Sequence, residues 1–236
     1  MSTNETPLTP ATGEPQGEPQ AEPQAMPGLP DDMLLVLPVR NMVLFPGVIL
    51  PVAIKRDKTE DPGFDDLQRV GTVASILRYI TAPDGTHHLV CQGERRFRVL
   101  DAVGGFPYLV ARVEYLSDSG SAHPEVEARS LYLKQKAAEA ISLLPQAPAE
   151  LANSLQSIES PSTLADTIAS FLDVKPAEKQ ELLEVLDLRE RLERVATLLT
   201  KRVEVLKLSR QIEQQTKDAI DDRQREIVLR EQLRQI

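Results

Sequence analysis

The chain has 236 residues, of which 41% are apolar and only 4% aromatic, so any core that it forms is mainly aliphatic. Its formal net charge of -9 argues against a protein dedicated to binding nucleic acid or an anionic membrane. The lone Cys91 cannot form an internal disulfide, and no transmembrane-length apolar run or signal peptide is apparent, so we expect a soluble cytoplasmic protein.

Residues 1–32 are predicted to be a disordered tail. They contain no Lys or Arg and include the proline-, glutamate- and glutamine-rich stretch GEPQGEPQAEPQ. Such a segment buries too little apolar surface to offset its chain entropy. A proline-rich recognition tail is the alternative that composition leaves open.

Residues 33–120 carry the signals of a β-rich domain. Two short apolar runs, MLLVLPV and GVILPVAI, are interrupted by prolines, which restricts them to edge or bulged strands. Asp84-Gly85 lies between two further apolar runs and predicts a hairpin turn. About six short strands with tight turns predict a small antiparallel β-barrel or sandwich.

From residue 121 the apolar period becomes that of α-helices, which makes the predicted class α+β. We expect a helical bundle over residues 121–185, in which Pro124 and Pro161 occupy first helical turns. One helix of this bundle is predicted to bury a single apolar stripe, made of Leu164, Ile168, Phe171 and Leu172.

A long helix is predicted over residues 186–236, and no Gly or Pro interrupts the chain from Ala177 onward. Its first part carries an apolar seam suited to packing on other helices, made of Leu188, Leu192, Val195, Leu199 and Leu206. Beyond Leu208 the residues are almost all polar, and a helix unbroken from Ala177 would measure roughly 90 Å. Its far end is therefore expected to project from the domain, and the missing stop signal suggests that more protein follows.

We find no arrangement of reactive groups that indicates catalysis, and we expect no catalytic, cofactor-binding or metal-binding residues. His87 and His88 are adjacent on a predicted strand and so point to opposite faces, which does not favour a shared metal. Cys91 lies too far along the strand from His87 for a direct hydrogen bond. No glycine-rich phosphate loop or nucleophile elbow occurs. The residues alone therefore indicate a binding or assembly module.

Four blocks, in chain order, resemble the amino-terminal region of the bacterial Lon family of ATP-dependent serine proteases. They are LPVRNMVLFPGVILPV, VGTVASILRYITAPDGTHHLVCQGERRFRV, PSTLADTIASFLDVKPAEKQELLEVLDLRERLERV and REIVLREQLRQI. The resemblance implies a PUA-like β-barrel, a helical bundle and a long helix that leads toward an ATPase module. It also implies that an AAA+ domain and a Ser-Lys protease domain follow, in a ring of six chains.

The motifs of those two domains are absent from these residues, so the fragment is expected neither to hydrolyse ATP nor to cleave peptides. ATP and Mg are implied only for the absent ATPase domain. The sequence departs from the family pattern after Ile54, where Lys55 and Arg56 lead directly to Asp57 and a block of residues is missing. That departure leaves open whether the barrel is closed on this side.

The resemblance implies capture of unfolded or damaged polypeptides, which requires exposed apolar surface. The predicted contacts are Met42, Val43, Leu44 and Phe45, because Met42 is adaptable and Phe45 is large. The alternative for Leu44 and Phe45 is that they close the barrel, since large apolar side chains are usually buried.

A second hypothesis is structural: the long helix is an assembly and spacing element. Ile212, Ile220 and Ile227 recur about every two turns on an otherwise polar helix and are the predicted self-association residues. The alternative is an isolated helix with scattered apolar residues.

Overall fold

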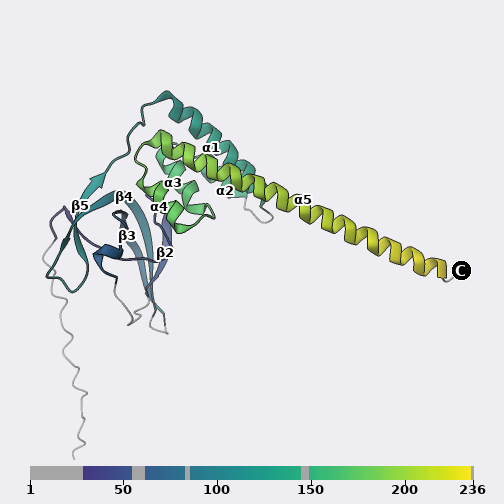
Figure 1. Cartoon of the computed structure of the whole chain (residues 1–236), viewed down its shortest axis with the longest axis horizontal. Helices are drawn as coiled ribbons and strands as arrows, with labels where there is room; N and C mark the ends of the chain where they lie inside the picture. The colour runs from purple at the N-terminus through teal and green to yellow at the C-terminus, as the bar shows by residue number, and fades with distance from the viewer. Residues whose placement is uncertain (1–28, 55–61, 83–85, 145–148, 235–236) are drawn as a thin grey trace, which may run out of the picture. The chain divides into compact units, whose positions relative to one another are not determined.

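The computed structural model describes residues 29–54, 62–82, 86–144 and 149–234. Most of the expected tail, the block after Ile54 and the expected Asp84-Gly85 turn lie outside these ranges. The chain from Asp31 onward forms one compact unit, in which the strands come first and the helices follow (Figure 1).

Five antiparallel strands form one sheet, in the order β1-β5-β4-β2 with β3 also paired to β4. The strands are β1 (Met33–Leu35), β2 (Ile49–Ile54), β3 (Val70–Thr81), β4 (His87–Val103) and β5 (Val110–Leu116). A single turn of 3-10 helix, Phe64–Asp66, precedes β3. The long strand β4 is central, because it pairs with β2, β3 and β5.

The antiparallel sheet and the α+β class are confirmed, but the expected closed barrel is wrong. Among the described strands, β1 pairs only with β5, while β2 and β3 each pair only with β4, so the sheet is open at all three of these strands. Closure requires a hydrogen-bonded ladder that continues around the whole sheet. The three residues of β1 provide no such link to β2.

The helices are α1 (Pro124–Leu143), α2 (Ala149–Gln156), α3 (Pro161–Phe171), α4 (Pro176–Glu184) and α5 (Leu188–Arg234). Pro124 and Pro161 begin their helices as predicted, and each follows a side-chain cap. His123 Nδ1 accepts a hydrogen bond from the Glu125 N–H, and Ser160 Oγ accepts one near the start of α3.

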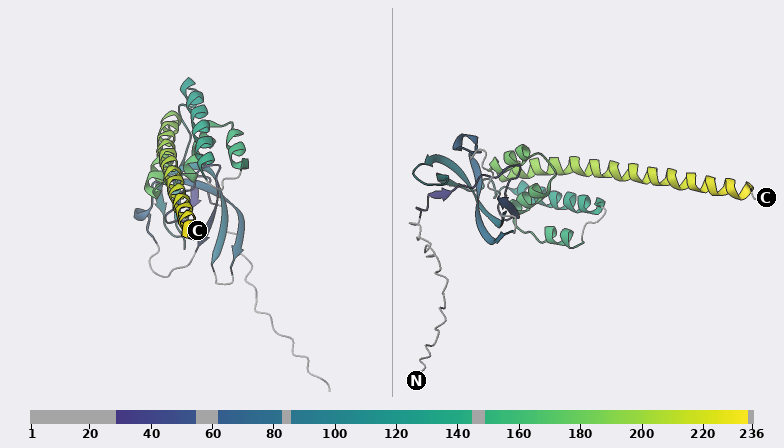
Figure 2. Two further views of the ribbon diagram at one scale, coloured as in Figure 1. Left: turned by 90° about the vertical axis from the view of Figure 1, so that its right-hand side faces the viewer. Right: turned by 90° about the horizontal axis from the view of Figure 1, so that it is seen from below.

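The predicted apolar seam of α5 is confirmed. Four of its residues, Leu188, Leu192, Val195 and Leu199, are buried, and the fifth, Leu206, packs against the core. α1 runs parallel to the first half of α5, as Figure 2 shows and as Arg129–Glu193 and Lys207–Glu139 ion pairs indicate. The predicted stripe of α3 is wrong at Phe171, which is 70% exposed. Phe171 ends the helix, and the following Leu172 fills the core instead.

The helical run from Ala177 is interrupted at residues 185–187, so α5 has 47 residues and measures roughly 70 Å. Ser119 pairs with this break through backbone hydrogen bonds and a parallel bridge to Asp187. The Asp187 carboxylate then accepts the Glu190 N–H at 3.0 Å and caps the new helix.

A buried arginine of the sheet reaches into the helices. Arg96 on β4 donates from Nη2 to Asp166 Oδ1 on α3 at 2.6 Å and from Nε to the Leu183 carbonyl at 2.8 Å. Its Nη1 also lies 3.7 Å from Asp118 Oδ1. The side chains of Arg96 and Asp166 are almost completely buried, so this contact anchors the sheet to the helical bundle.

A second buried arginine completes this group. Arg191 on α5 makes a two-pronged pair with Asp118, with Nη1–Oδ1 and Nη2–Oδ2 distances of 2.9 and 2.7 Å. Arg191 Nη2 also donates to Ser162 Oγ at 2.8 Å, and its Nε lies 3.4 Å from Asp166 Oδ1. We call Arg96, Asp118, Asp166 and Arg191 the two-arginine network.

The two carboxylates of the network differ in their pKa. For Asp118, burial alone would raise the pKa, but hydrogen bonds from Arg191 and Ser162 and the charges of both arginines hold it below its usual value. For Asp166, burial raises the pKa against the opposing influence of Arg96 and Arg191. Protonation of Asp118 at low pH is therefore coupled to loss of the network, because its folded-state pKa is the depressed one.

Replacing Asp166 by Ala should lower the free energy of unfolding by about 3–5 kcal/mol, because Arg96 and Arg191 would stay buried without their shared carboxylate. Urea denaturation followed by circular dichroism measures the change. The control is Asp101→Ala, which removes an exposed pair with Arg112 and should cost less than about 1 kcal/mol. Equal losses in the two variants would contradict a structural role for the network.

Candidate functional site

The predicted contact segment is a loop held firmly across the sheet. Phe45, Pro46 and Gly47 form a turn in which the Val48 N–H donates to the Phe45 carbonyl, and Gly47 adopts the positive φ of 77° that this turn requires. The Gly47 N–H donates to the carbonyl of Gly93 on β4, and the Gly93 N–H donates to the Val48 carbonyl, both at 2.9 Å.

Gly93 permits this close approach. A Cβ at position 93 would lie 2.2 Å from the Phe45 carbonyl oxygen, so no other residue fits without moving the loop. Thr72 Oγ1 on β3 adds a 2.6 Å hydrogen bond to the Leu44 carbonyl. The loop is therefore anchored to both β3 and β4.

Side chains of the loop alternate between two apolar clusters. Val43 and Phe45 pack in the main core with the helices, whereas Met42 and Leu44 pack on a smaller cluster with Val52, Leu89 and Cys91. This is the period of an extended chain.

Phe45 is 0% exposed, so its side chain is not available to a polypeptide. The sequence left open whether Phe45 contacts a polypeptide or is buried in the core, and the structure places it in the core. Its side chain packs with the buried side chains of the helices. Met42, Val43 and Leu44 are half-buried.

The smaller cluster belongs to a partly uncovered face of the sheet. Directly paired residues of antiparallel strands share a face, so Tyr79 lies beside Leu89, and Ile76 beside Cys91. Ile76 and Tyr79 are 61% and 58% exposed. We call this surface the open apolar face, and it comprises Met42, Leu44, Val52, Ile76, Tyr79, Leu89 and Cys91.

Ile76 and Tyr79 were not among the predicted contacts. The signal for them was the run ILRYI, whose apolar residues occur at both strand parities. A strand that is covered on one face only must leave some of these side chains in contact with water.

A polar group borders the open apolar face. His87 pairs with Thr81 in the register, and its Nδ1 lies 2.7 Å from Tyr79 Oη and 3.2 Å from Thr81 Oγ1. The rings of His87 and Tyr79 also stack, with centroids 5.5 Å apart. These contacts hold the Tyr79 ring in place at the edge of the face.

The predicted self-association residues lie on the exposed part of α5. Ile212 and Ile220 are both more than half exposed, and the side chain of Ile227 lies outside the described residues. Two further apolar residues, Val205 and Leu208, are exposed earlier on the same helix.

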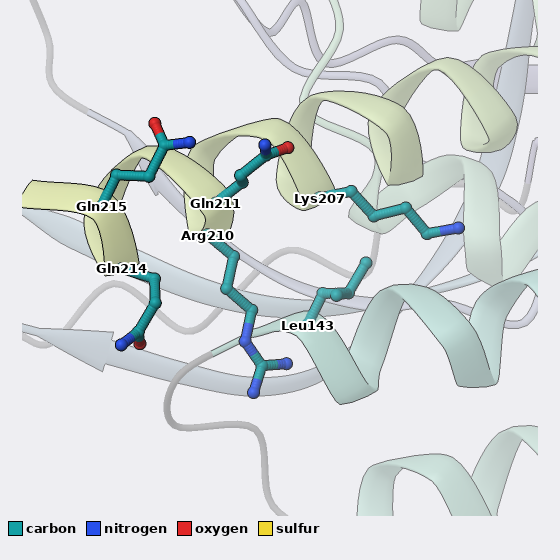
Figure 3. A pocket seen from close by; sticks show the side chains of 6 residues that line it. All are labelled: Leu143, Lys207, Arg210, Gln211, Gln214 and Gln215. Carbon is teal, nitrogen blue, oxygen red and sulfur yellow. The ribbon is translucent and has the colours of Figure 1, made fainter. Parts of the chain in front are cut away.

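A hollow of about 410 Å³ lies between Leu143 of α1 and polar side chains of α5 (Figure 3). Those polar residues are Lys207, Arg210, Gln211, Gln214 and Gln215.

Within the described ranges, no cluster of His, Cys, Asp or Glu side chains could hold a metal ion. No helix of the same residues has the length and apolar character of a membrane span.

Comparison with known proteins gives a consistent result. Residues 55–201 match the family model of the ATP-dependent protease La (LON) substrate-binding domain. The Lon protease of Paraburkholderia phytofirmans is 48% identical over 233 residues, which cover 88% of this chain and 29% of that protein. The Lon protease of Methylocella silvestris is 43% identical over 229 residues, or 87% of this chain and 28% of that protein.

The fold is similar to the N terminal domain of Mycobacterium avium complex Lon protease, with a TM-score of 0.62 and 22% identity. That match covers 71% of this chain and 98% of the solved domain. The chain spans less than a third of the length of the two relatives. The alignment with the Paraburkholderia phytofirmans protein is 233 residues long but covers only 88% of the 236 residues of this chain. Within the aligned region, that protein therefore has residues that this chain lacks.

The thiol of Cys91 should report on the open apolar face. Burial raises its pKa, so Ellman's reagent should label the native protein at least about tenfold more slowly than the urea-unfolded protein. Leu44→Ala should speed labelling because Leu44 packs on the cluster that contains Cys91. Leu131→Ala on α1 is the control, and an equal acceleration in both variants would contradict this placement.

Proposed function

Because the chain belongs to the family of Lon substrate-binding domains, we propose that it binds unfolded or damaged polypeptides for delivery to ATPase and protease domains of a longer protein. In that protein, the ATP-dependent serine endopeptidase activity would reside outside these residues. The family name supports the substrate class, and the length of the relatives supports the presence of further domains.

The observation that carries the proposal is the open apolar face. A protein that holds many unfolded sequences needs exposed apolar surface and adaptable side chains. Ile76 and Tyr79 provide the exposed area, and the half-buried Met42 and Leu44 border it. Val43 is a weaker candidate because it packs toward the main core.

The double substitution of Ile76 and Tyr79 by Lys should weaken binding of reduced, carboxymethylated lactalbumin at least about tenfold, since two charges would replace the exposed apolar contacts. Fluorescence anisotropy of the labelled protein measures the affinity without nucleotide, and native lactalbumin shows whether binding requires the unfolded state.

The control is Leu131→Lys, which places one such charge at an exposed apolar position of α1. Circular dichroism verifies that each variant is folded. If the control weakens binding as much as the double substitution, the open apolar face is not the binding surface. Phe45→Asp is unsuitable as a probe because a buried charge would destabilise the fold itself.

The second candidate function is self-association through α5. The exposed apolar residues Val205, Leu208, Ile212 and Ile220 support it, because they lie within one exposed sector of α5. In a homo-oligomer, such residues would bury apolar surface between neighbouring chains. A hexamer is the assembly that the family resemblance suggests for the longer protein.

Ile220→Asp should reduce self-association of the chain at least about tenfold in sedimentation velocity measurements, because the carboxylate would oppose burial of the helix surface. Gln214→Asp is the matched control, since helical periodicity puts it on the opposite side of α5 from Ile212. An unchanged sedimentation profile for Ile220→Asp would remove α5 from the self-association surface.

A further inference from the structure

The strand β3 has a free edge. Among the described strands, β3 pairs only with β4, although it extends over twelve residues. Its first residues are covered, because α4 packs there and Gln180 Nε2 donates to the Val70 carbonyl at 2.9 Å. The Arg69 carbonyl bonds to β4, so the Val70 carbonyl points to the opposite, free edge. One side chain thus caps the start of this edge.

The rest of the edge has little of the usual protection. Natural sheets shield exposed edges with prolines, charges, β-bulges or very short strands, and of these β3 has one charge and a register shift between Ile76 and Arg78 in its exposed part. The sequence VGTVASILRYIT of β3 has no proline, and its only charged residue is Arg78. Four apolar side chains near its end, those of Ile76, Leu77, Tyr79 and Ile80, are exposed.

We propose that an extended polypeptide segment adds to the free edge of β3 as a further strand. This inference rests on the proposed function and specifies its mode of binding. Backbone N–H and C=O groups of the segment would form hydrogen bonds with β3 whatever the side chains of the segment, so that segments of many different sequences could bind. Alternate side chains of the segment would contact the open apolar face beside Ile76 and Tyr79.

Arg78 favours a client segment over a second copy of the chain as the occupant. Two β3 strands paired antiparallel about the centre of the exposed run would set one Arg78 opposite the other, and like charges directly opposite destabilise a sheet. Arg78 pairs with Val90, so it lies on the face opposite Tyr79. The preferred segment therefore alternates apolar residues with polar ones and carries an acidic residue opposite Arg78.

The test uses a peptide of about ten residues that alternates Val and Thr and has Glu in place of one central Thr. One derivative carries backbone N-methyl groups at the Val positions. A second derivative carries the same number of N-methyl groups at the Thr and Glu positions. Because alternation fixes which face the Val side chains contact, only one set of N–H groups points at β3 for a given direction of the added strand. Methylation of that set should weaken binding at least about tenfold, and methylation of the other set by less than about twofold.

Equal affinity of both derivatives and the parent peptide would overturn strand addition. Failure of the parent peptide to bind, while carboxymethylated lactalbumin still binds, would also overturn it and leave the proposed function intact. Failure of lactalbumin to bind would instead overturn the proposed function.

A charge exchange on the protein provides an independent readout. Arg78→Glu should reverse the preference between the Glu peptide and the same peptide with Lys, by about fivefold or more in relative affinity. The control, Arg223→Glu on α5, should keep the preference for the Glu peptide. Self-association that the peptide competes away, measured by sedimentation, would identify a second copy as the occupant and overturn the proposal.

Discussion

The arrangement of the molecule depends on charge that is buried between the sheet and the helices. Arg96 comes from the middle of β4, Asp166 from α3 and Arg191 from α5, and they meet with almost no exposure to water. Such groups are costly to desolvate, so each must keep its partners for the folded state to persist. The position of the helices on the sheet is thereby set by hydrogen-bond geometry as well as by apolar packing.

The loop that carries Met42 and Leu44 has a defined position because it packs on the same core as the helices. Phe45 and Val48 belong to the same apolar core as the buried side chains of α1, α3 and α5. The close contact at Gly93 then presses the loop onto β4. Helices cover one side of the loop, and the other side borders the open apolar face, where Ile76 and Tyr79 stay in contact with water.

The candidate site was only partly predictable. Met42 and Leu44 belong to the open apolar face, and the apolar, proline-containing sequence around them was a sufficient signal for a loop next to a core. Phe45 could not be placed, because its burial depends on a turn and on a glycine 48 positions later in the chain. Ile76 and Tyr79 were missed because exposure of a strand depends on which element packs against it, and local alternation does not contain that information.

The α+β class, the helix starts at Pro124 and Pro161 and the buried seam of α5 could be predicted from the residues alone. These follow from periodicity, capping and proline geometry, which act over a few residues. Three other features became visible in the folded structure alone: the open sheet, the break between α4 and α5, and the burial of Arg96. Ser119 meets the break from 68 positions away in the chain, and Arg96 meets Asp166 from 70. Contacts between residues so distant in the chain depend on how whole helices and strands pack, and local propensity contains no information about that packing.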